Sequence, residues 1–152
     1  MKKIILLTSL LSLGLASCGN DDNTVLENET VETKLLGKWN AVKAEMYLNG
    51  KLEDSENLAA VKCENSYYEI KAGGTKDEVY FDEEGNCERE NYPGTWTYNT
   101  SNKHITIVDS DDNYTMIYEL VSVTNSDLKI KLIEDDGLTP DEGQEVFYYF
   151  KK

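Results

Sequence analysis

The chain has 152 residues, with 29 acidic and 15 basic side chains and a formal net charge of −14. This length fits one domain with a sizeable core. Nucleic acids and anionic lipid headgroups are poor partners for such a chain, because both are anionic. The charge is typical of a soluble domain beside a membrane, and attraction of cations or basic partners is the functional alternative.

The first 17 residues have the pattern of a secretory signal. Lys2 and Lys3 precede an apolar run over residues 4–15. This run is shorter than the ~20 residues that a membrane-spanning helix needs. Residues 15–18, Leu-Ala-Ser-Cys, resemble the bacterial lipobox, in which the signal is cut before the Cys.

The lipobox resemblance implies that Cys18 receives acyl chains such as palmitate. We therefore expect a lipid anchor in the bacterial cell envelope, with the outer membrane as partner and the domain facing either the periplasm or the cell surface. Residues 18–34 are polar and acidic, so we expect a flexible tether there. Asp21 and Asp22 resemble the surface-export signals of Bacteroidetes lipoproteins. Residues 35–152 remain for the folded domain.

From residue 35 the chain is a series of short runs separated by turns rich in Gly, Asn and Asp. This spacing predicts antiparallel strands in a sandwich or barrel, with meander order as the simplest connection. Residues 52–61 are the one stretch that favours a helical turn. The predicted strands are residues 38–48, 66–72, 78–82, 95–99, 104–108, 114–123, 128–132 and 145–150.

The strand at residues 128–132 has the clearest pair of faces. Leu128, Ile130 and Leu132 alternate with two lysines. Successive side chains of a strand point to opposite faces. We therefore expect the three apolar residues inside the barrel and Lys129 and Lys131 in solvent.

The first predicted strand changes its apolar parity partway along. Trp39 and Ala41 share one parity, whereas Val42 begins the other, which continues to residue 48. A β-bulge near Ala41 would switch the two faces. The alternative is that both faces of this strand are partly covered.

Two cysteines remain besides Cys18. An even number of cysteines in an exported chain most often pairs, so we predict a disulfide between Cys63 and Cys87. It would close a loop of ~25 residues, worth roughly 3 kcal/mol. A zinc site is disfavoured because zinc usually takes four ligands and the chain has one His. A redox role is disfavoured because there is no Cys-x-x-Cys pair.

Several short motifs follow one another along residues 35–152. They are Gly37-Lys38-Trp39, Cys63, Cys87, Gly94-Thr95-Trp96 and the aromatic run at residues 147–150. Their order resembles that of the lipocalin-like lipoproteins of Bacteroidetes, and the resemblance covers residues 35–152.

This resemblance implies an all-β fold, a lipocalin-like up-and-down antiparallel barrel of about eight strands with at most one short helix. It also implies a small-molecule-binding module. Lipocalins usually pack an Arg against the first Trp, but the only Arg here, Arg89, lies outside the last strand. Lys151 is the available substitute. The fold is carried over by the resemblance, whereas a particular ligand is not.

No stretch of the chain predicts a catalytic or metal site. Residues 109–113 resemble the start of a calcium loop, but Tyr114 stands where Gly is needed and Leu120 where Glu is needed. An acidic hairpin turn explains this stretch, and residues 135–143 form a second acidic loop that could border a barrel mouth. His104 has no accompanying nucleophile motif. We expect no enzyme activity, no cofactor and no metal.

Four aromatic or sulfur-containing residues are our candidates for a ligand-binding wall. Trp96 and Tyr98 share one face of a strand, and Met116 and Tyr118 share one face of another. No charged residue falls between them on either face, so the predicted ligand is small, neutral and apolar or aromatic. The alternative is that they are ordinary core, in a non-catalytic surface or envelope interaction domain with a filled barrel. We expect a monomer.

Overall fold

A computed structural model describes residues 29–60, 62–82 and 86–152. The predicted signal, Cys18 and most of the predicted tether lie outside these residues. Within the described part of the chain, no helix is both long enough and apolar enough to cross a membrane.

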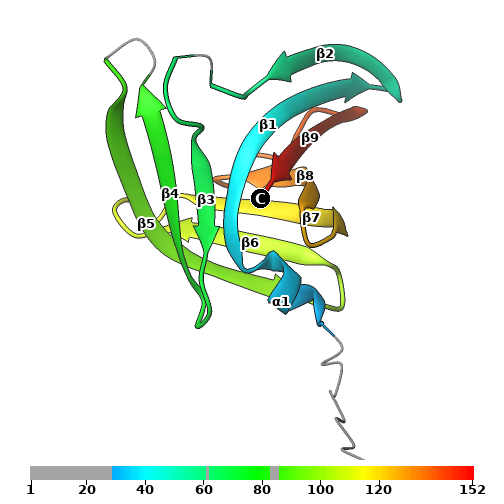
Figure 1. Cartoon of the computed structure of the whole chain (residues 1–152). Helices are drawn as coiled ribbons and strands as arrows, with labels where there is room; N and C mark the ends of the chain where they lie inside the picture. The colour runs from blue at the N-terminus through cyan, green and yellow to red at the C-terminus, as the bar shows by residue number, and fades with distance from the viewer. Residues whose placement is uncertain (1–28, 61, 83–85) are drawn as a thin grey trace, which may run out of the picture.

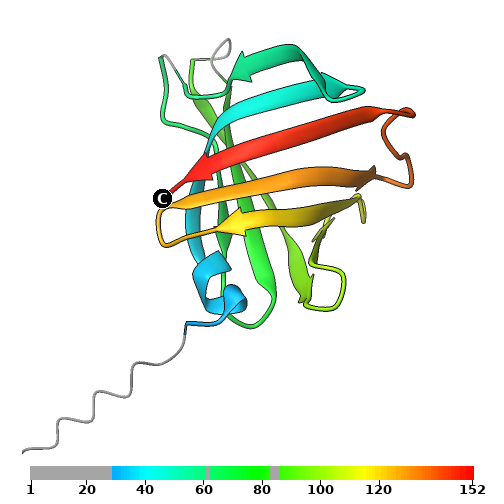
Figure 2. The same cartoon turned by 90° about the vertical axis from the view of Figure 1, so that its right-hand side faces the viewer.

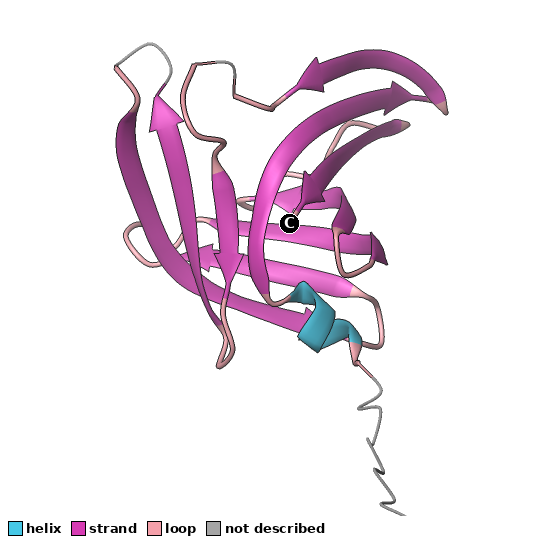
Figure 3. Cartoon of the chain, viewed as in Figure 1, coloured by secondary structure: helices cyan, strands magenta, loops and turns pink. Residues whose placement is uncertain are grey.

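In the part of the chain that the structure describes, nine antiparallel strands form one continuous sheet. A short helix precedes them (Figure 3). Eight strands close into a barrel because β1 pairs with β3 on one edge and with β9 on the other. The up-and-down barrel is therefore confirmed. The elements are α1 (Val31–Leu35), β1 (Gly37–Leu48), β2 (Lys51–Asn57), β3 (Tyr67–Ile70), β4 (Thr75–Asp82), β5 (Glu88–Asn99), β6 (His104–Asp109), β7 (Thr115–Val123), β8 (Asp127–Asp135) and β9 (Gln144–Lys151).

β1 is the strand on which the barrel closes, and it curves strongly across the molecule (Figure 1). Its first residues pair with β3, and its second half pairs with β2 on the same edge. On the opposite edge it pairs with β9, and this register shifts between Ala41 and Lys43. Val42 is thus the extra residue of a β-bulge, which confirms the predicted switch of faces.

Residues 51–57 form β2, so the predicted helical turn at residues 52–61 is wrong. Asn49 and Gly50 have φ values of 51° and 78°, which reverse the chain tightly and return it along β1. Every residue of β2 is exposed. Because nothing on this strand is buried, no apolar alternation marks it in the sequence, and pairing with β1 defines it instead.

β5 begins at Glu88, well before the predicted start at residue 95, and includes Pro93 and Gly94. Pro93 lacks an N–H, but its carbonyl accepts a hydrogen bond from the Ser110 N–H at 2.9 Å. Gly94 is required by close packing, since a Cβ there would lie 2.3 Å from the Val108 carbonyl oxygen. Both residues therefore belong to the strand rather than to a turn.

α1 lies against one end of the barrel (Figures 1 and 2), within the stretch that we assigned to the tether up to residue 34. Thr30 caps the helix by accepting the Thr33 N–H on its Oγ1 at 3.2 Å. Leu35 is buried, and its carbonyl accepts the Nε1–H of Trp39 at 2.7 Å. The folded domain therefore begins before residue 35.

Trp39 is completely buried, and a lysine covers its ring. This lysine is Lys152, whose Nζ lies 4.5 Å from the ring centroid and donates to the Lys34 carbonyl at 3.0 Å. Lys151, the expected partner, instead approaches Asp127 at 3.8 Å. The cation at Trp39 is thus the last residue of the chain, one position beyond the predicted one.

The inner face of β8 is as predicted. Leu128 and Ile130 are buried, and Leu132 packs half-buried against the same cluster. Lys129 and Lys131 lie on the outer face but are half-buried there rather than free in solvent. The buried members of the core are Leu35, Trp39, Ile70, Trp96, Ile105, Ile107, Tyr118, Leu120, Leu128, Ile130 and Phe150.

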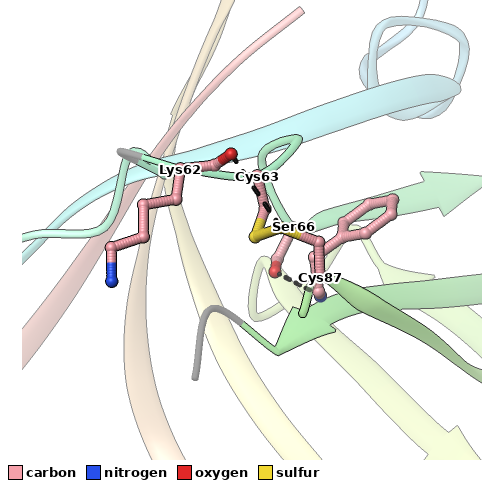
Figure 4. The surroundings of a disulfide bond; sticks show 5 residues. Lys62, Cys63, Ser66 and Cys87 are labelled. Atoms are coloured by element: carbon pink, nitrogen blue, oxygen red, sulfur yellow. Dashed lines mark hydrogen bonds between the residues drawn. A yellow bond between two sulfur atoms is a disulfide. The ribbon is translucent and has the colours of Figure 1, made fainter. Parts of the chain in front are cut away.

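Cys63 and Cys87 form the predicted disulfide, with their Cα atoms 5.5 Å apart (Figure 4). The bond joins the loop between β2 and β3 to the start of β5. This loop leaves the barrel wall at Leu58 and returns at Ser66, and both residues hydrogen-bond to the backbone of β1. The disulfide therefore holds a loop whose two ends already meet beside the bulge of β1.

Candidate functional site

The barrel has a closed end and an open end. The closed end carries α1 and the turns that join β3 to β4, β5 to β6 and β7 to β8. The open end carries the connections β1–β2, β4–β5, β6–β7 and β8–β9. The acidic stretches 109–113 and 135–143 lie at the β6–β7 and β8–β9 connections, so both are at the open end.

The structure brings the four candidate wall residues onto the inner face, but at different depths. Trp96 and Tyr118 are 8% and 6% exposed and belong to the buried core, whereas Tyr98 and Met116 are half-buried against it. The Tyr118 hydroxyl donates to Met116 Sδ at 3.0 Å. The Trp96 Nε1–H donates to the Lys71 carbonyl at 2.9 Å. Met116 and Tyr118 therefore form one contact pair, while Trp96 is fixed within the closed half.

An apolar cavity lies in the closed half, and its volume is about 30 Å³. Trp96 and Tyr118 both line it, together with Trp39 and Phe150, whereas Tyr98 and Met116 do not. Pockets for small ligands usually have volumes of about 300–1,000 Å³. The closed half is therefore packed core with space for about one water molecule.

The open half differs because inward-facing side chains there reach solvent. Tyr92 lies opposite Glu78, and Tyr80 opposite Glu90, in the β4–β5 ladder. Residues opposite one another share a face of the sheet, so both tyrosines face inward with Glu78. They are nevertheless 47% (Tyr80) and 40% (Tyr92) exposed. The inner face at this end is thus open to solvent and aromatic.

Tyr148 extends this aromatic surface from the other side of the barrel. It lies opposite Ala44 of β1 and Ile130 of β8. Its ring meets that of Tyr118 edge to face, with centroids 5.9 Å apart. The two rings in contact, Tyr118 and Tyr148, thus extend from the packed core to the open half.

A charged cluster lies on the inner face between the two halves. The Lys76 side chain has no exposed surface, and its Nζ donates to Asp109 Oδ1 and, at 3.2 Å, to the Tyr92 carbonyl. Glu78 Oε2 lies 3.5 Å from the same nitrogen. Burial raises the pKa of Glu78 above its ordinary value. The barrel interior therefore holds charged groups as well as the four uncharged candidate residues.

The tyrosine hydroxyls of this region stay protonated at neutral pH. Burial raises the pKa of Tyr68, Tyr118 and Tyr148. The hydroxyl of Tyr114 donates to Asp135, and this hydrogen bond raises its pKa to about 12. Tyrosine side chains at the open half can therefore offer both a ring face and a hydrogen-bond donor.

Two depressions mark the outer surface near β8 and β9. One, of about 470 Å³, lies where these strands diverge and includes Lys131, Pro140 and Glu145. The other, of about 330 Å³, lies over Lys43, Lys129 and Tyr149. Within the described residues, no three His, Cys, Asp or Glu side chains come together as a metal site.

Sequence patterns do not indicate the charged cluster, and the reason is physical. In β4, Lys76 and Glu78 share one face, and Val79 and Phe81 share the other. Apolar alternation therefore predicts the wrong face of β4 as the inner one. The signal that could have located Lys76 is Gly94 within a strand. A glycine there indicates close approach of another group, and an added Cβ would lie 2.7 Å from Lys76 Cε.

Comparison with known proteins is consistent with this architecture. The family described as "Lipocalin-like domain" matches residues 35–130. A lipocalin-like protein from Bacteroides uniformis has a similar fold, with a TM-score of 0.51 and 15% sequence identity over 78% of this chain and 98% of that one. A deswapped triple mutant of bovine odorant binding protein gives a TM-score of 0.44 and 15% identity over 78% and 74% of the two chains. No curated protein matches the sequence.

Proposed function

Because this chain belongs to the lipocalin-like domain family, we propose that it is a binding protein that holds a small apolar or aromatic molecule in the open half of its barrel. One observation carries this proposal: Tyr80 and Tyr92 face inward and are still 47% and 40% exposed. An apolar ligand that covers large aromatic rings at a barrel mouth removes them from water, which favours binding.

The four candidate residues take different parts in this proposal. Met116 and Tyr118 form the base of the site, because their contact pair lies next to Tyr148 at the start of the open half. Trp96 and Tyr98 belong to the packed closed half and support that base. Trp96 then reports ligand binding through its fluorescence without touching the ligand.

An apolar fluorescent dye tests the proposal directly. The folded protein should take up the dye, and Tyr118→Ala should weaken uptake while the domain stays folded. Tyr67→Ala is the matched control, since Tyr67 lies on the outer face of β3 under the Nζ of Lys38. Equal loss of dye binding in both variants would count against a site at Tyr118.

A second candidate function rests on the small volume of the cavity in the closed half. If side chains also fill the open half, the protein acts as a non-catalytic interaction domain through its acidic loops and outer surface. In that case neither the native protein nor Tyr118→Ala takes up dye. Tyr118→Ala should then cost about 3–5 kcal/mol, as truncation of a packed aromatic does.

We also propose that this barrel is held at the bacterial outer membrane by lipid on Cys18. Support comes from the short apolar signal and the lipobox-like residues 15–18. Cys18→Ala should release the protein from membrane fractions and abolish labelling by a fatty-acid analogue. Retention of both properties would contradict the anchor. Several acyl chains are needed, because a single chain binds membranes only weakly.

A further inference from the structure

Lys76 is a buried amine that ligand binding does not use. Its side chain has no exposed surface, and its Nζ contacts the Asp109 carboxylate. The Asp109 side chain is itself only 16% exposed. A lysine ammonium and a carboxylate are thus held together away from bulk water, where each charge loses hydration.

The strand register places Lys76 and Asp109 on either side of a glycine, on the same face of the sheet. Lys76 lies opposite Gly94 in the β4–β5 ladder, and Gly94 lies opposite Asp109 in the β5–β6 ladder. The three residues therefore form one line across three strands. A Cβ on Gly94 would lie 2.7 Å from Lys76 Cε, so the lysine stem uses the space that glycine leaves.

A second carboxyl group stands beside the pair. Glu78 lies two residues after Lys76, on the same face of β4, and its Oε2 is 3.5 Å from Lys76 Nζ. Burial raises the pKa of Glu78. Tyr68 is packed close by, with its ring centroid 5.7 Å from Nζ. The amine therefore has one carboxyl to react with and another positioned to accept and return a proton.

We propose that Lys76 and Asp109 condense into an intramolecular isopeptide bond, with Glu78 acting as the proton shuttle. A proton first passes from the Lys76 ammonium to Asp109, which gives an amine and a carboxylic acid. The Nζ lone pair attacks Cγ of Asp109 and forms the C–N bond. Glu78 accepts the second proton from Nζ and returns it to the leaving hydroxyl. The C–O bond breaks, one water departs, and no oxidant or reductant is needed.

The site favours this condensation in two ways. The barrel holds nucleophile and electrophile in contact, so the reaction needs no encounter between free groups. The product replaces two poorly hydrated charges with one neutral amide, which removes their desolvation cost. The amide would tie β4 to β6 across β5. This crosslink does not depend on the proposed ligand, and it would form whether or not the open half binds one.

An outer-face ion pair provides an internal control. Lys71 follows β3 directly and donates to Asp77 of the neighbouring strand β4, but the Lys71 side chain is 42% exposed. Water hydrates these charges, so we expect no condensation there. Asp77→Asn should therefore leave the Lys76–Asp109 crosslink unchanged.

Peptide mass spectrometry of the purified, reduced protein tests the proposal. Trypsin does not cleave after an acylated lysine, so residues 72–89 should stay intact and be joined to residues 104–129, with a mass lower by one water than the two peptides together. In Glu78→Gln the free peptide 72–76 should appear and the joined species should be lost, with circular dichroism showing that the barrel is folded. Recovery of free 72–76 and full-mass 104–129 from the native protein would overturn the bond. An unchanged crosslink in folded Glu78→Gln would overturn the role of Glu78.

Discussion

At the scale of single residues, Glu45 shows how the outer face of the barrel is fixed. Its carboxylate accepts Lys43 Nζ at 2.7 Å, Tyr149 Oη at 2.5 Å and Tyr47 Oη at 3.2 Å. The hydrogen bond from Lys43 is the largest of the effects that lower the pKa of Glu45 to about 2. Three donors from two strands thus favour the ionised carboxylate.

The lowered pKa of Glu45 predicts how the stability of the domain changes in acid. Because its folded-state pKa lies below the ordinary value of 4.5, its contribution is complete above that value and is lost as pH falls towards 2. Thermal unfolding should show Glu45→Gln to be less stable than the native protein at pH 7. The difference should shrink as the pH falls through this range. A difference that stays constant with pH would show that the ionised carboxylate is not what stabilises the face.

The same scale shows what sequence patterns can and cannot predict. Trp96 and Tyr118 were expected on the inner face because two-residue spacing in a strand fixes the side of each residue. Lys76 and Glu78 were not, because hydropathy favours Val79 as the inward residue. Val79 is indeed buried, but it stands apart from the main core cluster. Only the pairing of β4 with β3 and β5 decides which face is inside.

At the scale of the elements, β8 separates the two faces of the sheet most clearly. Ile130 is 5% exposed on the inner face, whereas the Lys129 Nζ lies 4.3 Å from the Phe147 ring centroid on the outer face. Successive positions of one strand therefore meet opposite environments.

Aspartate at these two neighbouring positions should have very different effects. Ile130→Asp places an unpaired charge in the core and should unfold the domain, because such burial is costly. Lys129→Asp should leave it folded, with a loss of about 1 kcal/mol from the cation–π contacts. Circular dichroism and urea denaturation distinguish the outcomes. Equal tolerance of both substitutions would contradict the face assignment.

The disulfide holds the loop that follows β2. Its cysteines are 24 residues apart in sequence. Replacing both Cys63 and Cys87 by Ala should lower the unfolding free energy by roughly 3 kcal/mol through the loop entropy of the unfolded chain. Urea denaturation of the double variant measures this. A negligible change would mean that the hydrogen bonds at the ends of the loop already hold it.

Strands differed in how well sequence could locate them, and burial explains the difference. β8 alternates apolar and basic residues because one face packs in the core, so its position was predicted. β2 is exposed along its whole length, so it has no such pattern. The Asn49-Gly50 turn before it is one of the turns rich in Gly, Asn and Asp, but the strand itself is recognisable only from its pairing with β1.

At the scale of the whole molecule, the two halves of the barrel interior differ, and the cluster of Lys76, Glu78 and Asp109 lies on the wall between them. On one side, α1 and Trp39 close a packed apolar half around a cavity of about 30 Å³. On the other, tyrosines face inward and remain in contact with solvent. The order of the sequence motifs predicted the barrel, but not this division, because it depends on strands that are distant in sequence.

The central claim is that a small ligand occupies the open half, and NMR titration of the folded protein with the apolar dye tests it most directly. Signals should shift for inward residues of the open half, including Tyr80, Tyr92 and Tyr148, and for Met116 and Tyr118 at its base. Signals of the outer-face residues Tyr67 and Tyr149 should stay in place. Shifts confined to the outer face, or none at all, would contradict ligand binding inside the barrel.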